Sequence, residues 1–555
     1  MAKLIIQQKI APTPKNYFRS VNSNRRQNDW PEKEFEFEDT SGEFSNDWDD
    51  AHHAIRNNNN LLFAEPDIDV ALPFFPECTY DKEATSDHSN DEVVDNIDYS
   101  NYIDEWPHPK DKKYVWHVEN KFSQLKAAID SVSPLPKDKI IRIAHLDTGY
   151  DIEHSSFPRA LINFDLSRNF IEGENEKDAT DRFIEGMLKN PGHGTGTLSI
   201  LAGNNIPIAG CGESHDFIGL KHSVEIVPMR IATSVVLLRA SGFIKAMDYI
   251  VNTLNQNNDT RIHILTMSMG GLPSKAWADL VNKAYEQGVF MVCAAGNNFN
   301  KFPTNNLVYP ARFNRVVAAC GVTHDFSPYA KKEGSFKIME GNHGPLPLMK
   351  TALAAFTPNV PWAVWKKKDL FGIRGDGTSS ATPQIAMAAA LYYIKNFDIL
   401  EKLSARFMIV EAIRFALFNT ASKKITPSTD NYEEYFGNGI LQANDALSVE
   451  VKDEEFLTNR KQKMDTVFFP FLRILFGLRG KKEEIVLQML DTELMQLLMT
   501  DDRIQDFVDF SKIDISIEFV RNRKALAKYL LSSGKISQNL RKKLKKVLTI
   551  LDKEE

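Results

Sequence analysis

The feature that most constrains this 555-residue chain is a long alternation of apolar runs and amphipathic helical segments that begins near residue 114. Short apolar runs are typical of strands buried on both faces, and helical segments between them serve as crossovers. The predicted strands are Ile140–Leu146, Glu225–Ile231, His263–Met269, Val289–Ala294 and Val316–Gly321, and the predicted crossover helices are Leu237–Leu254 and Ala276–Glu286. The pattern predicts an α/β fold: a doubly wound, mainly parallel sheet with helices on both faces.

This core spans residues 114–449, and the regions on either side of it differ from it in composition. Residues 1–75 hold short apolar bursts in polar sequence and could form either a small α+β unit or a partly ordered arm. Residues 76–113 are acidic and too poor in large apolar side chains to fold alone, which predicts a linker. Residues 450–555 predict a small helical C-terminal domain, because they hold three amphipathic segments. These are Glu483–Leu498, Ile515–Leu531 and Ile536–Leu551.

The charge distribution says more than the total charge. A net charge of −7 and a pI of about 6.1 give no reason to expect nucleic acid as a partner. Acidic residues gather between positions 32 and 105, and basic residues gather near the C-terminus. The two ends could attract each other, although solvated helix faces explain the basic clusters equally well. The clusters are Arg521, Arg523 and Lys524, and Arg541, Lys542, Lys543, Lys545 and Lys546.

Cysteine usage and the absence of long apolar runs bear on the compartment. The four cysteines, Cys78, Cys211, Cys293 and Cys320, show no metal-site spacing and are interpreted as buried free thiols. Glutamines break the apolar run at the N-terminus, and no run of eighteen apolar residues occurs, so neither a signal peptide nor a membrane span is predicted. The expected compartment is the cytoplasm, with leaderless export left open.

Two polar residues stand where open α/β sheets place active sites. Asp147 ends the strand Ile-Ile-Arg-Ile-Ala-His-Leu-Asp and precedes a Thr-Gly turn. By itself this pattern is more often only a strand-ending turn. His193 lies in Pro-Gly-His-Gly-Thr-Gly-Thr, at the start of a predicted helix, where flanking glycines are expected to keep the imidazole accessible and free to turn. A single loop histidine, however, is usually a surface residue.

Two further motifs supply a hydroxyl and a carboxamide. Ser379, in Gly-Asp-Gly-Thr-Ser-Ser-Ala-Thr-Pro, starts a helix of small residues, where its hydroxyl is exposed and its backbone N–H is unpaired. Ser380 is an alternative nucleophile, and either serine could be only a helix cap. Asn297 follows a buried strand and Gly296, and its NH₂ group can donate to a developing oxyanion. Gly-Asn is also a common turn pair.

In the order Asp, His, Asn, Ser, these motifs resemble those of the subtilisin-like serine peptidases over residues 116–447. The resemblance implies that Ser379 is the nucleophile, His193 the general base and then acid, and Asp147 the group that orients the imidazole. Asn297 and the backbone N–H of Ser379 would then form the oxyanion hole.

The same resemblance points to a substrate cleft. Ser268-Met269-Gly270-Gly271 looks like the edge segment against which an extended peptide adds as a strand, with its glycines leaving space for substrate side chains. Gly296 is assigned to the same cleft. Residues 437–439, Gly-Asn-Gly, look like the closing element of the domain, and residues 324–376 are expected to line the cleft or act as a lid.

The residues before the linker resemble an inhibitory propeptide. Asn-Asn-Leu-Leu-Phe-Ala-Glu65-Pro66-Asp67 looks like the closing strand of such a segment. This implies that residues 1–70 are a prodomain whose tail lies in the cleft until it is cut.

No cofactor is required for the expected chemistry. Calcium binds many members of the family, and Asp165, Asp178 and Asp181 could offer oxygen ligands, although their spacing follows no regular calcium motif.

The leading interpretation is an intracellular serine endopeptidase that hydrolyses proteins or peptides through an acyl-enzyme on Ser379. The alternative is a catalytically silent or regulated relative that binds extended peptides or partner proteins in the same groove. A regulatory partner would dock on the C-terminal helices.

Overall fold

The computed structural model describes most of the chain. The described residues are 3–8, 34–40, 43–44, 46–68, 103, 106–110, 115–182, 190–204, 206–207, 214–215, 223–237, 239–298, 306–330, 339–467, 481–505, 507 and 523–554. Most of the predicted linker and part of the predicted helix Ile515–Leu531 lie outside them.

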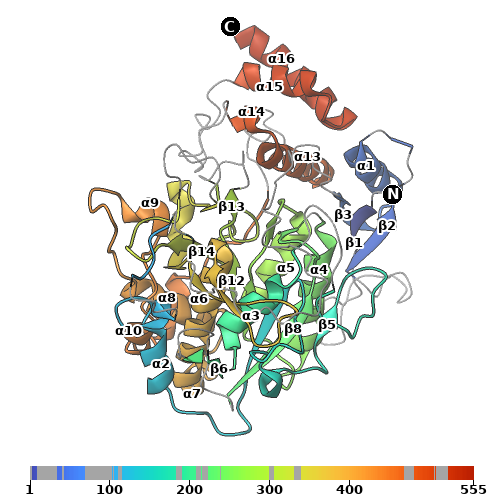
Figure 1. Ribbon diagram of the computed structural model, residues 1–555. Helices are drawn as coiled ribbons and strands as arrows, with labels where there is room; N and C mark the ends of the chain where they lie inside the picture. Colours follow the sequence, from blue (N-terminus) through green and yellow to red (C-terminus); the bar gives the residue numbers. More distant parts are fainter. Residues whose placement is uncertain are drawn as a thin grey trace, which may run out of the picture.

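A seven-stranded parallel sheet forms the centre of the molecule (Figure 1). Its order is β16-β14-β12-β10-β4-β8-β5, and every pair of neighbours is parallel. The strands are β4 (Ile141–Asp147), β5 (Arg168–Asn169), β8 (Val224–Arg230), β10 (Ile264–Met267), β12 (Phe290–Ala294), β14 (Val317–Val322) and β16 (Ala352–Phe356). The doubly wound parallel sheet predicted from the sequence is confirmed, and all five predicted strands begin and end within two residues of the observed ones.

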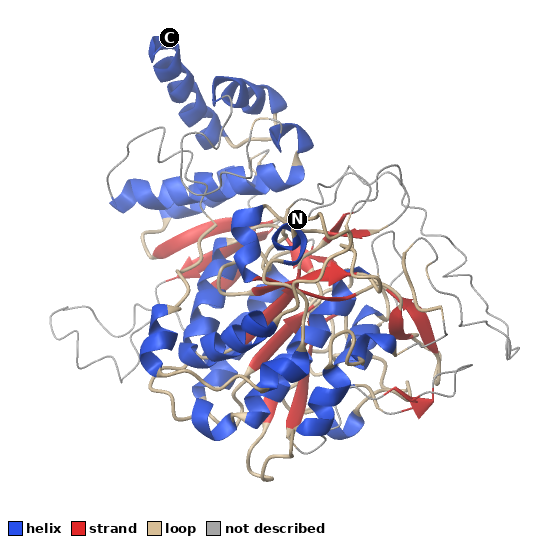
Figure 2. Cartoon of the chain, turned by 90° about the vertical axis from the view of Figure 1, so that its left-hand side faces the viewer, coloured by secondary structure: helices blue, strands red, loops and turns tan. Residues whose placement is uncertain are grey.

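The sheet is covered by helices on both faces (Figure 2). The long helices of this domain are α3 (His193–Ala202), α4 (Ser241–Asp248), α5 (Lys275–Glu286), α6 (Gly377–Lys395) and α8 (Phe407–Thr420). Helix α6 is buried along nearly its whole length and contacts β10, β12, β14 and β16. The predicted crossover Leu237–Leu254 is α4 continued by the π-helical turn η5 (Tyr249–Thr253) and by η6 (Leu254–Gln256).

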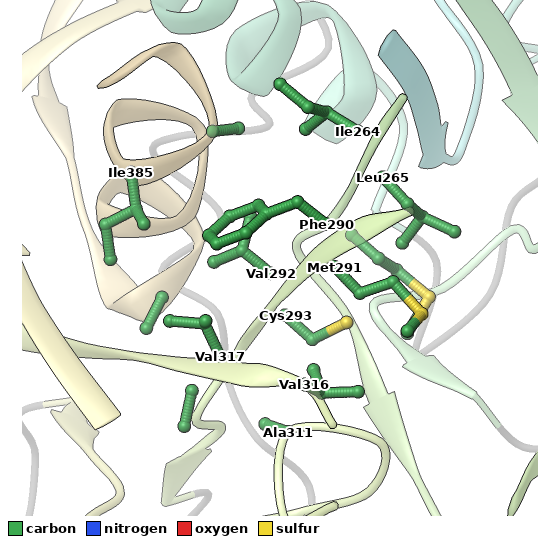
Figure 3. Packing of buried hydrophobic residues seen from close by; sticks show 14 of the residues in the cluster. Ile264, Leu265, Phe290, Met291, Val292, Cys293, Ala311, Val316, Val317 and Ile385 are labelled. Carbon is green, nitrogen blue, oxygen red and sulfur yellow. The ribbon is translucent and has the colours of Figure 1, made fainter. Parts of the chain in front are cut away.

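Alternation along β12 divides the core into two layers (Figure 3). Phe290 and Val292 point towards Ile385 of α6, whereas Met291 and Cys293 point to the opposite side. All five side chains are almost completely buried. A strand packed on both faces must be apolar at every position, and this is why its apolar run shows no polar alternation.

The remaining elements are shorter. They are η3 (Trp116–Val118), α2 (Leu125–Ser131), η4 (Arg159–Leu161), β6 (Ile206–Pro207), β7 (Ser214–His215), β9 (Val236–Leu237), β11 (Gly270–Gly271), β13 (Asn297–Asn298), β15 (Glu340–Gly341), η7 (Leu346–Thr351), β17 (Val360–Ala363), β18 (Phe371–Gly375), α7 (Phe397–Leu400), α9 (Tyr432–Phe436), α10 (Ala443–Leu447), α11 (Glu454–Asn459) and α14 (Asp502–Gln505).

Residues 324–376, expected to line the cleft or act as a lid, are largely part of the fold. They supply the edge strand β16 and the antiparallel hairpin β17–β18. The Gly-Asn-Gly segment closes the domain at this edge, as the resemblance implied: the backbone N–H of Asn438 donates to Ala352, and that of Ala354 donates to Gly439.

A small N-terminal unit packs on α4 and α5. It consists of β1 (Lys3–Gln8), β2 (Phe35–Asp39), α1 (Asp47–Asn57) and β3 (Leu61–Asp67), with the three strands in the antiparallel order β2-β1-β3. Ile5 and Phe35 on one face of this sheet join the core of the large domain. Leu4 and Ile6 on the other face form a second core with Trp48 of α1.

The first and last of the C-terminal helices contact this N-terminal unit, and the helix between them packs on the last one (Figure 1). They are α13 (Lys481–Thr500), α15 (Arg523–Ser533) and α16 (Gln538–Glu554), and Met489 of α13 completes the second core. The two ends of the chain therefore meet. They do so through apolar contacts and helix capping: the Asp49 carboxylate accepts hydrogen bonds from the Gln538 backbone N–H and the Asn539 amide at 3.0 and 3.1 Å.

Cys293 and Cys320 are buried free thiols, as predicted, and burial raises the pKa of the Cys320 thiol to about 12. Cys78 and Cys211 lie outside the described residues. Within the described part of the chain, no helix has the length and apolar character needed to cross a bilayer.

Candidate active site

Strand β4 and helix α3 bring Asp147 and His193 together. Asp147 is the last residue of β4 and is 1% exposed, and His193 is the first residue of α3. The imidazole Nδ1 lies 2.7 Å from Asp147 Oδ1, which also accepts the Thr148 backbone N–H at 2.8 Å. A histidine held at Nδ1 by a carboxylate presents Nε2 as its base.

The glycines around His193 do not leave open space, and the expectation of an imidazole free to turn is wrong. A Cβ on Gly192 would lie 2.2 Å from the Trp365 side chain, and one on Gly196 would lie 1.9 Å from the Trp362 ring. Trp362 in turn meets the His193 ring edge to face at 5.4 Å. The missing side chains therefore make room for two indoles of the β17–β18 hairpin region, which pack beside the imidazole.

Ser379 lies in the first turn of α6 and faces the end of β10. Its hydroxyl donates to the Ser268 carbonyl at 3.2 Å, and the Ser268 hydroxyl donates back to the Ser379 carbonyl at 3.0 Å. In this conformation the Ser379 proton points to a carbonyl, so activation by an imidazole requires the hydroxyl to rotate. Ser380 is completely buried and donates to the Asp376 carbonyl at 3.0 Å, which makes it a local helix contact.

Asn297 is held beside the start of α6. Its side-chain oxygen accepts the Thr378 backbone N–H at 2.9 Å. The turn before Ser379 approaches closely because Gly377 has a φ of +70° and a Cβ there would lie 2.9 Å from Asn297 Nδ2. With its oxygen committed to Thr378, the carboxamide keeps its NH₂ as a hydrogen-bond donor.

The segment Ser268–Gly271, which is expected to bind substrate, makes backbone contacts with two other parts of the chain. Gly270–Gly271 forms β11, which pairs in parallel with β9, and the Gly271 backbone N–H donates to the Tyr309 carbonyl at 2.8 Å. The Val308 side chain fills the space beside Gly270 and Gly296, where it would lie 2.3 and 2.8 Å, respectively, from an added Cβ. At these two glycines the missing side chain accommodates Val308, which corrects the expectation that Gly270 leaves room for substrate.

Electrostatics at the pair favour an ionised aspartate. Complete burial would raise the Asp147 pKa, but the His193 charge and hydrogen bond outweigh it, and the pKa is lowered. Around it, Thr148 Oγ1 and the Gly192 N–H both donate to Asp181 at 2.7 Å, and Arg230 pairs with the same carboxylate. Asp181, mainly through burial, has its pKa raised to about 6.

Comparison with known proteins agrees with this geometry. The model of the subtilase family, Peptidase_S8, matches residues 138–439, more than half of the chain. The chain belongs to the subtilase family. This subtilase is 26% identical over 334 residues to the major intracellular serine protease of Bacillus subtilis, which covers 58% of this chain and 88% of that protein.

Two further relatives carry the same kind of name. A subtilisin-like protease of Coccidioides posadasii is 27% identical, over 51% of this subtilase and 59% of its own length. Subtilisin DY of Bacillus licheniformis is 25% identical, over 54% and 88% respectively. The subtilase is accordingly a serine endopeptidase that hydrolyses peptide bonds in proteins or peptides, and no finding favours the catalytically silent alternative.

The three aspartates considered for calcium do not form a cage in the subtilase. Asp178 pairs with Arg182 and accepts from Thr180, and Asp181 is occupied as described above. Among the described residues, no group of three His, Cys, Asp or Glu side chains is arranged to hold a metal.

Sequence reasoning missed three side chains that touch the Asp147–His193 pair or its surroundings. They are Trp362, Thr197 and His145. A usable signal existed for two of them: His145 precedes Asp147 by two residues on a strand, and Thr197 follows His193 by four on a helix, spacings that place each on the same face as its neighbour.

Proposed function

We propose that Ser379 is the nucleophile of this serine endopeptidase, that His193 is its general base and acid, and that Asp147 orients the imidazole. The observation that carries the proposal is the part-buried 2.7 Å contact between His193 Nδ1 and Asp147 Oδ1; a different element, α6, carries Ser379 to the end of β10. His193 Nε2 would take the Ser379 proton as Oγ attacks the peptide carbonyl, and would return it to the leaving amine.

Asn297 is the second part of the proposal. Its NH₂ group, oriented by the bond from Thr378 to its oxygen, would donate to the oxyanion together with the Ser379 backbone N–H. Replacing Asn297 by Ala should lower kcat by about 10²- to 10³-fold while KM changes little, because the donor acts mainly in the transition state. Peptide hydrolysis kinetics measure this, and an unchanged kcat would remove Asn297 from the oxyanion hole.

Covalent labelling by a fluorophosphonate tests the nucleophile. The probe should mark Ser379, as found by peptide mapping, and Ser379→Ala should abolish the label. Ser380→Ala is the matched control, since Ser380 is turned into its own helix, and it should still be labelled. Labelling of Ser380 in place of Ser379 would show that the proposal names the wrong serine as nucleophile.

We also propose that the N-terminal unit is an inhibitory propeptide, with its tail directed to the cleft. Support comes from two buried carboxylates at the end of β3. Glu65 accepts hydrogen bonds from Ser274 Oγ and from the Lys275 and Ala276 backbone N–H groups at the start of α5. Asp67 accepts the Ser241 N–H at the start of α4. Acidic groups at helix N-termini are stabilising, so the unit is docked at two points. The residues after 68 that would enter the cleft lie outside the described ones.

The C-terminal helices are proposed to hold this propeptide in place, and a regulatory partner would act by releasing it. Gln496 of α13 accepts from the Trp48 indole N–H at 3.0 Å and donates to the Pro273 carbonyl at 3.0 Å, so one side chain ties the N-terminal unit to the residues before α5. Both contacts are buried.

Mass spectrometry over time after purification tests the propeptide. The active enzyme should cut itself between the N-terminal unit and the peptidase domain, and the released piece should co-purify because the C-terminal helices hold it. Ser379→Ala should stay intact. An uncut chain with full activity would contradict the proposal.

We propose, separately, that this enzyme acts inside the cell. Its support is the similarity to the major intracellular serine protease of Bacillus subtilis. Fractionation of cells that express the full chain should find the protein with cytosolic markers, and recovery from the medium of intact cells would contradict this.

A further inference from the structure

The second oxygen of Asp147, which the His193 contact does not use, is also engaged. Thr197 Oγ1 lies 3.0 Å from Asp147 Oδ2, and His145 Nε2 lies 2.8 Å from the same Thr197 oxygen. The His145 ring is 4.0 Å from Asp147 Oδ2, so its connection to the carboxylate runs through the threonine hydroxyl. All three side chains are at most 3% exposed.

This arrangement follows from the periods of the two elements. His145 and Asp147 are two residues apart on β4, so they point to the same face of the sheet. His193 and Thr197 are four residues apart on α3, so they lie one turn apart on the same side of the helix. Strand and helix therefore face each other with three side-chain contacts: Asp147 meets both His193 and Thr197, and His145 meets Thr197.

The number of protons on His145 and Thr197 fixes the direction of the two hydrogen bonds. Burial lowers the His145 pKa to about 4, so the ring is neutral near pH 7 and carries one N–H. The Thr197 hydroxyl has a single proton. If it were given to His145, two oxygens would face each other at 3.0 Å with no proton between them, one of them on an ionised carboxylate. Both contacts are satisfied when His145 Nε2–H donates to Thr197 and Thr197 donates to Asp147.

A competing acceptor does not change this conclusion. The Thr197 hydroxyl also lies 3.2 Å from the Gly194 carbonyl, as expected for a threonine inside a helix. The carboxylate is closer and charged, and bonds to charged acceptors are the stronger ones. A hydroxyl that accepts from an imidazole is also polarised towards donating more strongly.

We propose that Thr197 and His145 are positioning residues for the catalytic aspartate. The chain from His145 through Thr197 fixes the rotation of the Asp147 carboxylate, so that Oδ1 stays aligned with His193 Nδ1, and it draws part of the negative charge towards Oδ2. The inference rests on the proposed role of Asp147 in the triad. It assigns to this protein a two-residue support behind the carboxylate, Thr197 and then His145, with its far end buried in the sheet.

Loss of the Thr197 hydroxyl should have two effects. The carboxylate would no longer be held in rotation, so activation of Ser379 should fall about tenfold, the effect of one hydrogen bond to a charged group. More charge would remain on Oδ1 beside His193, which stabilises the imidazolium and should move the acidic limb of the activity profile upward by about half a pH unit.

The rate constant for fluorophosphonate labelling of the full chain, measured from about pH 5 to 9, reports both effects without a peptide substrate. Thr197→Val removes the hydroxyl at nearly constant shape and should label about tenfold more slowly, with the shifted midpoint. Thr197→Ser keeps the hydroxyl and should label nearly as the wild type does. The other charged groups near Asp147, namely His193, Asp181 and Arg230, are the same in all variants.

Variants of His145 test the far end of the chain. His145→Gln keeps a donor at a similar reach and should be close to wild type, whereas His145→Leu should show a smaller form of the Thr197→Val effect. His145→Leu combined with Thr197→Val should be no slower than Thr197→Val alone, because the imidazole acts through the hydroxyl. If Thr197→Val does not fold, as judged by circular dichroism, the two His145 variants carry the test.

Two results would overturn the inference. One is a Thr197→Val enzyme with the wild-type rate constant and midpoint, and the other is a Thr197→Ser enzyme impaired as much as Thr197→Val, which would assign the role to the methyl group. Failure of the underlying triad looks different: the wild type would not be labelled, or Ser379→Ala would be.

Discussion

Two buried carboxylates, Asp147 at the end of β4 and Glu493 in the middle of α13, have pKa values shifted in opposite directions. The pKa of Asp147 is lowered, whereas burial raises the pKa of Glu493 to about 8. Asp147 receives donors from His193, Thr148 and Thr197. Glu493 receives two hydrogen bonds from Ser537, at 2.6 and 2.8 Å, and the negative charge of Asp49 nearby raises its pKa further.

The comparison teaches that burial alone does not set the charge of a carboxylate. A neighbouring imidazole and several donors keep the peptidase aspartate ionised and ready to stabilise an imidazolium. At the junction of the C-terminal helices and the N-terminal unit, burial and the nearby negative charge of Asp49 raise the pKa of Glu493 to about 8 despite its two hydrogen bonds from Ser537. Donors around Asp147 favour its ionised form, whereas burial of Glu493 favours its protonated form.

The largest expected effect comes from removing the charge at Asp147. Asp147→Asn should lower kcat by about 10⁴-fold, because an amide favours the wrong imidazole tautomer and cannot stabilise the imidazolium. Peptide hydrolysis and the fluorophosphonate labelling rate measure this. Glu493→Gln is the matched control at the second carboxylate and should keep its kcat; an equal loss in both variants would mean that the chosen changes act through folding.

A smaller effect, on stability, is expected at Glu493. Its folded pKa lies above the unfolded value of 4.5, so the folded chain holds a proton that the unfolded chain loses. The free energy of unfolding of the helical tail should therefore fall as the pH rises from about 4.5 to 8. Glu493→Gln should remove this slope and stabilise the tail by roughly 2 to 4 kcal/mol at about pH 8, with no gain at about pH 4.5. Thermal unfolding across this range measures it, and parallel curves for both proteins would contradict the buried proton.

The smallest effect is expected at Glu65, which stands between the two cases. It is buried and its pKa is raised, yet it accepts three hydrogen bonds at the start of α5. Glu65→Ala should weaken docking of the N-terminal unit by roughly 1 to 2 kcal/mol, the usual cost of losing a helix cap. Limited proteolysis should then remove the unit several-fold faster. Glu38→Ala, at an exposed position of β2, is the control and should change nothing.

Much of the peptidase domain could be predicted because each candidate active-site residue lies at the end of an apolar run or at the start of a helix. Asp147 and Asn297 follow buried strands, and His193 and Ser379 lie at helix starts, so the local pattern also indicated their positions in the fold. Strand β16 was missed because Ala352–Phe356 is rich in alanine, which has low strand propensity. Strand β5 was missed because it is two residues long.

What could not be predicted are contacts between residues far apart in sequence. Glycine at 196 suggested open space, since nothing in the local sequence places Trp362 against it. Similarly, the acidic and basic ends suggested attraction between charged clusters, whereas the observed junction uses the cap from Asp49 to Gln538. One local sequence pattern is compatible with several structures, and only the tertiary contacts decide which of them forms.

Met489 belongs to the apolar core of a unit that lies more than 400 positions earlier in the chain. Without α13, this core would lose the side chain that closes one side of it, so the first strands depend on a helix from the far end of the chain. A recombination event that brought in only one of them would leave the neighbouring core open to water. The two segments that flank the peptidase domain are therefore coupled in stability, although that domain separates them along the chain.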